Sequence, residues 1–230
     1  MKKIMFSDRY GLTQAVLDGK KTMTRRKVIT PADMTCDFWN PVMGIDDKGK
    51  VYFTVDCCDG RRRDIYPQYQ IGEVLVIAQP YKNIIAAITP TYGSPHAYDG
   101  LRREAGWNNK MFVRADLMPH RIRIKNIKVE RLQDISDVDC RKEGIIHVNW
   151  RQYLKQDVYD FTPQKYKEHS LWTLPIFEES FLDSWAEKKP GEYAAESTKV
   201  AFAVLIFKLM GRKVWEQNHF VFAYEFELVR

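Results

Sequence analysis

The sequence predicts an α+β fold in which a curled, barrel-like sheet carries helices at its rim. A short strand candidate and a helix begin the chain, several strands follow, and helices then separate them from a last strand at the C-terminus. Strands and helices that are grouped rather than strictly alternating are typical of this fold class. At 230 residues the chain is long enough for one large domain, or for a smaller one with sizeable insertions.

Composition indicates a soluble globular protein, with 45% hydrophobic and 29% charged residues. The net charge of +6 favours acidic partners such as nucleic acid. The N-terminus lacks the apolar run of a secretory signal, and the apolar run at 200–207 is too short to span a bilayer. We therefore expect a cytoplasmic protein without membrane contact. The cysteines and histidines lack zinc-site spacing, so we expect no metal and no cofactor.

The first elements lead into a strongly basic stretch. Residues 2–6 predict a short strand, and Ser7 or Asp8 can cap a helix that runs to Asp18. Gly19 supplies the left-handed residue that ends such a helix. The basic stretch, residues 19–27, then reads GKKTMTRRK.

The middle of the chain is rich in strand-forming residues. Residues 49–55 predict one arm of a hairpin, and residues 72–80 predict a buried strand. Residues 82–108 show little periodicity and are interpreted as a long insertion loop. In residues 120–132 the apolar alternation slips by one position near Lys125–Asn126. The slip indicates either a β-bulge in one strand or two strands joined by a tight turn.

The second half alternates between helix signals and a final strand. Residues 136–144 predict a short helix that Ser136 caps and Gly144 ends. Further helices are expected at 162–169, 177–191 and 198–210. The C-terminal residues from Phe220 alternate in the pattern of a strand that buries an aromatic stripe, which favours core packing over base stacking.

The basic stretch allows three interpretations once a Walker phosphate loop is excluded. That motif does not fit, because Lys21 separates Gly19–Lys20 from Thr22 and because the helix precedes the stretch instead of following it. It can be a solvated turn favoured by the negative end of the preceding helix. Its cations can contact phosphates of a nucleic acid. It can also be catalytic, since a threonine hydroxyl becomes a nucleophile when a base such as lysine takes its proton. Spacing alone does not identify the carboxylate that such a site needs.

Four segments of the chain resemble the ASCH family, whose fold is a PUA-like β-barrel. They read GKKTMTRRK, GEVLVIA, RIRIKNIKVERLQDISDVDCRKEGI and WEQNHFVFAYEFELV, and the likeness is greatest to phage and prophage-encoded ASCH proteins. The resemblance implies a single domain over residues 1–230 with insertions at about 30–70, 82–108 and 146–195. It also implies a basic cleft that binds RNA, a nucleotide or a modified nucleoside.

One branch of the family consists of N4-acetylcytidine amidohydrolases that use a lysine, a threonine and a glutamate. By resemblance these roles fall on Lys21, Thr24 and Glu143, with Thr24 attacking an amide carbonyl and Lys21 taking its proton. The neighbouring side chains would hold the ligand: Lys20, Thr22, Arg25 and Arg26. The amidohydrolase branch lacks the helical insertion, so the alternative is a non-catalytic phage accessory protein that binds a protein partner through residues 146–195.

Overall fold

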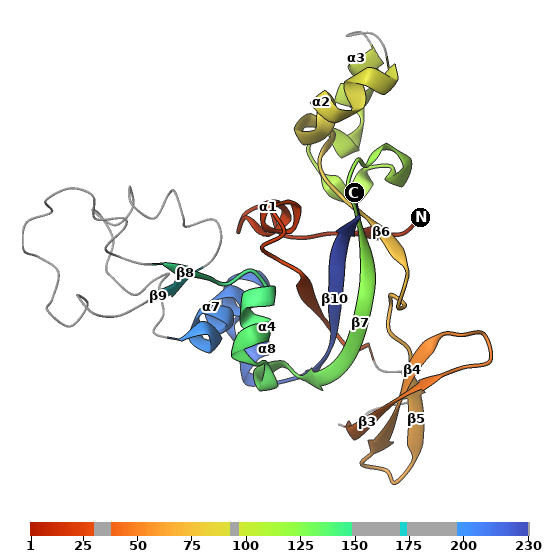
Figure 1. Cartoon of the computed structure of the whole chain (residues 1–230), viewed down its shortest axis with the longest axis vertical. Helices are drawn as coiled ribbons and strands as arrows, with labels where there is room; N and C mark the ends of the chain where they lie inside the picture. Colours follow the sequence, from red (N-terminus) through yellow and green to blue (C-terminus); the bar gives the residue numbers. More distant parts are fainter. Residues whose placement is uncertain (30–37, 93–96, 149–170, 174–196, 230) are drawn as a thin grey trace, which may run out of the picture. The chain divides into compact units, whose positions relative to one another are not determined.

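The computed structural model describes residues 1–29, 38–92, 97–148, 171–173 and 197–229. It confirms a mixed α+β fold (Figure 1). The strands are β1 (Lys3–Ile4), β2 (Met23–Lys27), β3 (Phe38–Ile45), β4 (Val51–Cys57), β5 (Arg62–Ile65), β6 (Val74–Ile77), β7 (Arg121–Arg131), β8 (Ile146–Val148), β9 (Leu171–Thr173) and β10 (Phe220–Val229). The α-helices are α1 (Leu12–Leu17), α2 (Tyr81–Tyr92), α3 (Ala97–Arg103), α4 (Asp137–Lys142), α7 (Thr198–Met210) and α8 (Arg212–Glu216). Single 3₁₀ turns cover Ala105–Trp107, Lys110–Phe112, Ala115–Leu117 and Leu132–Asp134.

The strands form a five-stranded, a three-stranded and a two-stranded sheet. The large sheet has the order β1-β6-β7-β10-β2, and the smaller ones are β3-β4-β5 and β8-β9. Within the large sheet β1 runs parallel to β6, while β6 and β7 are antiparallel. Among the described strands the large sheet has two open edges, β1 and β2, and does not close into a barrel. The PUA-like barrel therefore stays a prediction.

The chain divides into two compact units, and it passes between them four times. Unit 1 comprises Met1–Phe6, Arg25–Glu130 and Phe220–Arg230, and unit 2 comprises Ser7–Thr24 and Arg131–His219. Contacts over such long sequence separations define both units, because neither consists of one continuous segment. The single domain over residues 1–230 stays a prediction.

The core of unit 1 is built on the long strands β7 and β10, which are neighbours in the sheet (Figure 1). The aromatic stripe predicted for the last strand is buried at Phe222, Tyr224 and Phe226. Phe220 stacks on Phe38 with ring centroids 4.1 Å apart, so the stripe also packs the hairpin sheet against β10. Aromatic packing of this kind stabilises the core beyond simple area burial.

Most of residues 120–132 form one strand, β7, and not two, while Leu132 begins a 3₁₀ turn. Ile122, Ile124 and Ile127 are buried, while Lys125 and Asn126 between them are both exposed. The Asn126 side chain accepts the N–H of Ile127 at 2.9 Å, at the position of the slip. Apolar side chains on both sides of the slip are therefore buried.

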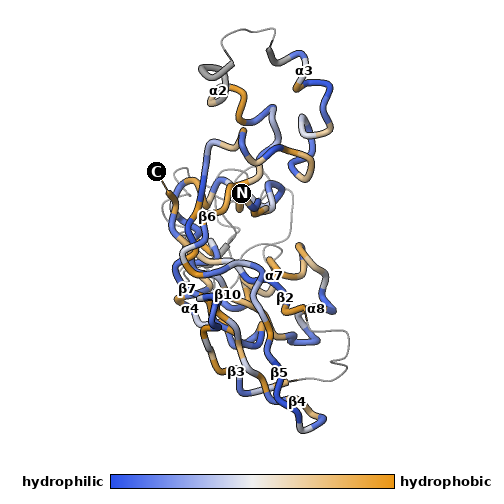
Figure 2. Tube along the Cα trace, turned by 90° about the vertical axis from the view of Figure 1, so that its right-hand side faces the viewer, coloured by the Kyte–Doolittle hydropathy of each residue, from blue (hydrophilic) through white to orange (hydrophobic). Residues whose placement is uncertain are grey.

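Unit 2 is organised around α7, whose predicted bounds are confirmed. The Ser197 side chain accepts the N–H of Val200 at the helix start, and Gly211 follows the helix end. Figure 2 shows that hydrophobic residues predominate along α7. Among them, Phe202 and Leu205 are buried. Thr198 Oγ1 donates to Asp137 Oδ1 at 2.5 Å, which joins α7 to the start of α4.

Several sequence predictions differ from the structure. Helix α1 begins at Leu12 and not after Ser7 or Asp8, because residues 8–11 form a turn in which Gly11 adopts φ 65°. The segment 82–108, predicted as a loop, contains most of α2, all of α3 and a 3₁₀ turn. The predicted helices at 162–169 and 177–191 lie outside the described residues, as does most of the 146–195 segment.

Two kinds of feature are absent from the described part of the chain. No helix there combines the length and the apolar character needed to cross a bilayer. No group of three or more His, Cys, Asp and Glu side chains in those residues is arranged to hold a metal ion.

Candidate functional site

The start of the basic stretch is fixed by the end of helix α1. Gly19 has φ 74°, as predicted, and turns the chain away from the helix. The N–H of Lys21 then donates to the carbonyl of Ala15 at 2.9 Å, and the N–H of Thr22 donates to that of Lys142 at 2.8 Å. These bonds hold the backbone around Lys21 against the end of helix α4, within unit 2.

Glu143 is positioned by the end of α4, which follows the sequence prediction closely. Ser136 caps the helix by accepting the N–H of Asp139 at 3.2 Å. At the other end Gly144 has φ 98°, its N–H donates to Arg141, and the N–H of Ile145 donates to Cys140. This pair of bonds is a Schellman motif, with Glu143 as the last residue before the left-handed glycine. The motif fixes the backbone of Glu143 at the helix end.

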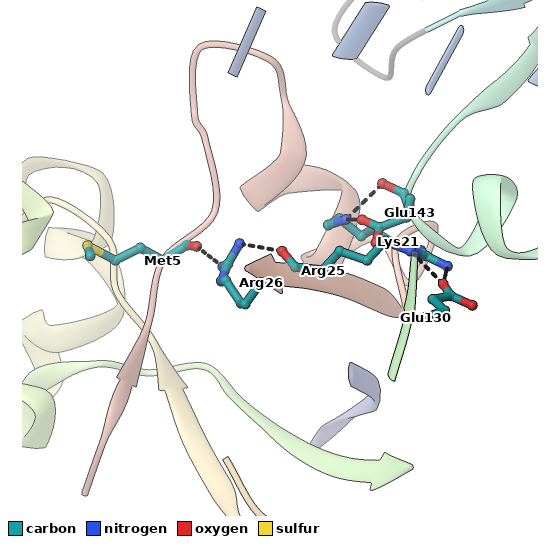
Figure 3. A network of polar contacts seen from close by, with 6 residues as sticks. All are labelled: Met5, Lys21, Arg25, Arg26, Glu130 and Glu143. Carbon is teal, nitrogen blue, oxygen red and sulfur yellow. Dashed lines mark hydrogen bonds and ion pairs between the residues drawn. The ribbon is translucent and has the colours of Figure 1, made fainter. Parts of the chain in front are cut away.

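Lys21 and Glu143 form a buried ion pair within unit 2 (Figure 3). The ammonium Nζ lies 2.5 Å from Glu143 Oε2, and it also donates to the Glu143 carbonyl at 2.9 Å. The two side chains are 1% and 5% exposed. Charges removed from water in this way are tolerated only when they are paired and hydrogen-bonded. The structure therefore brings together two of the three residues to which the resemblance gives catalytic roles, although 122 positions separate them.

Thr24, the third of these residues, lies in β2 and also belongs to unit 2. It is 3% exposed, so its hydroxyl is held inside the protein rather than in solvent. Thr22 is half-buried and Lys20 is exposed. Of the predicted site residues in unit 2, Lys21, Thr24 and Glu143 are thus buried, while Lys20 and Thr22 are accessible to a ligand.

Arg25 forms a second buried ion pair, in unit 1, with a residue that the sequence did not single out. Its Nε and Nη2 lie 2.9 and 2.5 Å from Glu130 Oε1 (Figure 3). Lys128 Nζ lies 2.9 Å from Glu130 Oε2. Glu130 belongs to the VERLQDIS segment that carries the family resemblance. The family segment is the only sequence feature that points to Glu130. No local sequence pattern indicates that Glu130 pairs with Arg25, because the two residues are 105 positions apart.

Arg26 differs from Arg25 in its partners. It is half-buried, its Nη2 donates to the carbonyl of Met5 at 2.7 Å, and its Nη1 lies 3.4 Å from the carbonyl of Arg25 (Figure 3). In the described residues it has no carboxylate partner, so its positive charge is not neutralised by an ion pair. Of the two arginines predicted to bind a ligand, Arg26 carries the more available charge.

Two buried tyrosines of unit 1 lie within the electrostatic influence of Arg26. Burial raises the pKa of the Tyr224 phenol to about 12, and the positive charge of Arg26 opposes that rise. Burial likewise raises the pKa of the Tyr69 phenol, and the positive charge of Arg26 again opposes the rise. The Tyr224 oxygen accepts the N–H of Gln68 at 3.0 Å. Both phenols therefore stay neutral at physiological pH and leave the charge of Arg26 intact.

Comparisons of the chain with protein-family models, with curated proteins and with solved structures found no match. The ASCH resemblance therefore rests on the sequence segments quoted above.

Proposed function

We propose that this chain is an ASCH-type, PUA-like protein that binds RNA, a nucleotide or a modified nucleoside, and that it can hydrolyse an amide on such a ligand. The observation that supports this most is the 2.5 Å contact between Lys21 Nζ and Glu143 Oε2 in the interior of unit 2. Family resemblance alone points to both residues, which stand 122 positions apart in the chain. Two side chains that are costly to bury are thus paired in the interior.

The reaction requires a base, a nucleophile and a group that controls the base. Lysine can act as a base only as the neutral amine, and Glu143 is close enough to accept a proton from the Lys21 ammonium. The neutral amine then takes the proton of the Thr24 hydroxyl while the oxygen attacks the amide carbonyl. Collapse of the tetrahedral intermediate breaks the C–N bond, and Lys21 returns the proton to the leaving amine.

The second half of the reaction uses the same groups. Water, deprotonated by Lys21, attacks the acyl group on Thr24, the C–O bond breaks, and the proton passes back to the Thr24 oxygen. The products are a carboxylic acid and the free amine. On N4-acetylcytidine, the substrate of the amidohydrolase branch, they are acetate and cytidine.

Hydrolysis is tested by incubating the protein with N4-acetylcytidine and measuring the cytidine released by chromatography. We expect Lys21→Ala and Thr24→Ala each to lower the rate by about a thousandfold or more. Matched controls are Lys213→Ala and Thr54→Ala, which remove an exposed lysine and a half-buried threonine elsewhere. Turnover that persists in both site variants would rule out the proposed reaction.

Binding is tested separately, by fluorescence anisotropy with a labelled single-stranded RNA between 50 and 200 mM salt. Phosphate contacts make the affinity fall steeply as salt rises. Arg25→Ala together with Arg26→Ala should flatten this dependence, and Arg26→Ala should account for most of the change. If neither RNA nor N4-acetylcytidine binds even at low salt, the alternative role as a protein-binding accessory protein takes precedence.

A further inference from the structure

The three-stranded sheet of unit 1 has two edge strands, β3 and β5, that differ in charge (Figure 1). Strand β5 reads RRDI and carries a charge at three of its four positions. Charged side chains on an edge strand hinder pairing with another chain. Strand β3 reads FWNPVMGI and carries no charge. Within the described part of the chain no strand pairs with β3 on its outer side, so this edge lacks the protection that β5 has.

Apolar side chains are exposed on both faces of β3. Met43 stands opposite Phe53, and Ile45 stands opposite Val51. Their partners in β4 are buried on one face of the sheet, but Met43 and Ile45 on the same face are 52% and 66% exposed. Val42 lies on the other face and is also exposed. A partner on one face would leave one set in water, whereas a strand added at the edge contacts both.

Backbone groups of β3 point to the same open edge. The N–H of Val51 donates to the Gln70 side chain at 2.6 Å, and the Val51 carbonyl accepts from it at 3.2 Å. Val51 therefore directs its backbone groups away from Ile45, and the two residues form a non-hydrogen-bonded pair. In such a pair the N–H and carbonyl of Ile45 point away from β4. Because the two kinds of pair alternate along a ladder, the backbone groups of Met43 point outward as well.

The open stretch of β3 is short and complementary to itself. Pro41, which has no N–H, lies at the register shift and limits the stretch on one side. The turn at Asp46 limits it on the other. Two copies can pair antiparallel with Gly44 on a two-fold axis, so that Met43 of each copy faces Ile45 of the other. This register uses the outward N–H and carbonyl of both residues in each copy and brings no like charges together.

Gly44 suits the axis of such a pair. Opposite residues at this point would form a non-hydrogen-bonded pair, in which Cα atoms approach to about 4.5 Å. A Cβ on Gly44 would come within 2.5 Å of the Tyr52 ring, so this ring already occupies the space over the glycine. With glycine in both copies, each Tyr52 ring keeps its place. On the opposite face Met43 and Ile45 of the two copies form one apolar cluster.

We propose that β3 pairs antiparallel with β3 of a second copy of this chain, so that two three-stranded sheets join into one of six strands. A second copy fits because the same stretch supplies both sides of a symmetric, uncharged pairing. The charged β5 edges stay outside the pairing, so the assembly closes at two copies. The inference goes beyond the proposed function and does not depend on ligand binding or hydrolysis.

The test is sedimentation velocity of the whole chain at increasing protein concentration, which should show monomer and dimer and no larger species. Met43→Lys together with Ile45→Lys sets like charges opposite each other, and we expect the dimer dissociation constant to rise at least tenfold. Met43→Lys together with Ile45→Glu sets opposite charges there and should dimerise at least ten times more tightly than the double-lysine variant. Added salt should strengthen the first dimer and weaken the second.

The matched control is Phe112→Lys, which replaces an exposed apolar side chain of unit 1 outside the sheet and should leave the dissociation constant unchanged. Because all the substituted positions are exposed, each variant should keep the circular dichroism spectrum of the unsubstituted chain. A chain that stays monomeric at every concentration overturns the inference. So does a double-lysine variant that dimerises as tightly as the unsubstituted chain, because another surface then holds the dimer. Equal losses in the two double variants overturn the register, and a series of larger species overturns the closed pair.

Discussion

Two buried ion pairs, one in each unit, use cations from the same short basic stretch. In unit 2 Lys21 meets Glu143, and in unit 1 Arg25 meets Glu130. Both pairs join positions more than a hundred residues apart, and both involve contacts as short as 2.5 Å. The carboxylates differ: Glu130 is 14% exposed and shared with Lys128, whereas Glu143 is 5% exposed at the end of a helix.

The two cations differ in whether they can release a proton, and this difference bears on function. A guanidinium does not lose its proton in proteins, so the Arg25 pair can hold β2 and β7 in place but cannot take part in proton transfer. Burial favours the neutral form of a lysine, whereas a neighbouring carboxylate favours the ammonium. Of the two pairs, only the Lys21 pair can take part in the proton transfer proposed above, and we expect a positioning role at the Arg25 pair.

The largest effect should follow from removing one partner of the more buried pair. Glu143→Leu leaves the Lys21 ammonium in the interior without its carboxylate, and we expect the free energy of unfolding to fall by about 3 to 5 kcal/mol. Urea denaturation measures it. The double variant Lys21→Met with Glu143→Leu should recover most of the loss, since two apolar side chains can replace a buried pair. A single variant as stable as the double would contradict this account.

Breaking the Arg25 pair should cost less, because Glu130 keeps Lys128 and some contact with water. For Arg25→Met we expect a loss of about 2 to 3 kcal/mol in the same assay. Arg25→Lys should restore only part of it, since an ammonium cannot reproduce the two contacts of the guanidinium fork. Full recovery in Arg25→Lys would show that charge alone matters at this position. In neither variant should the proposed hydrolysis of N4-acetylcytidine be abolished.

Alkaline pH should destabilise unit 1 through its buried phenols. Burial raises the pKa of Tyr224 to about 12, whereas an unfolded tyrosine titrates near about 10. Between these values the unfolded chain loses a proton that the folded chain keeps. The contribution of Tyr224 to the free energy of unfolding is therefore fully present below about pH 10 and is lost as the pH rises to about 12. The loss should approach about 2 kcal/mol. Denaturation at pH 9 and pH 11.5 measures it, and Tyr224→Phe should remove most of the difference; Tyr69 contributes in the same direction.

The smallest effect is expected at an exposed pair that serves as the reference for both buried ones. Arg212 Nε lies 2.7 Å from Glu216 Oε1, but the two side chains are 79% and 57% exposed. Glu216→Gln should change the free energy of unfolding by less than about 0.5 kcal/mol, because water and salt screen the charges. A loss similar to that of Glu143→Leu would mean that burial is not what separates these pairs.

Local sequence signals were sufficient where one segment determines its own structure. The bounds of α7, the cap and end of α4, and the aromatic stripe of β10 all follow from residues a few positions apart, such as Ser136, Gly144 and Gly211. The Lys21–Glu143 contact has no such local signal. Family resemblance gives both residues roles in one reaction, but whether Glu143 reaches Lys21 depends on the fold.

Other features depended on packing between distant segments. Helix α2 contains Pro90 and lacks a clear helical pattern, but Tyr81 and Ile84 pack into a core with Leu101, Val113, Leu117 and Met118. The fit is close, because a Cβ on Gly106 would come within 2.5 Å of the Tyr81 ring. Strand β3 contains Pro41 and Gly44 and forms because it pairs with β4, with a register shift at the proline.

The sequence by itself determined the short helices with strong caps, the last strand and the identity of the basic stretch. Only the tertiary structure decided which carboxylate each cation meets and which polar atoms lack a partner. Three examples are the pairing of Lys21 with Glu143, the pairing of Arg25 with Glu130, and the buried oxygen of Gln79, which has no hydrogen-bond partner in the described part of the chain. The cost of removing a charge or an amide from water depends on every group that surrounds it in space, and that environment is assembled from segments far apart in the chain.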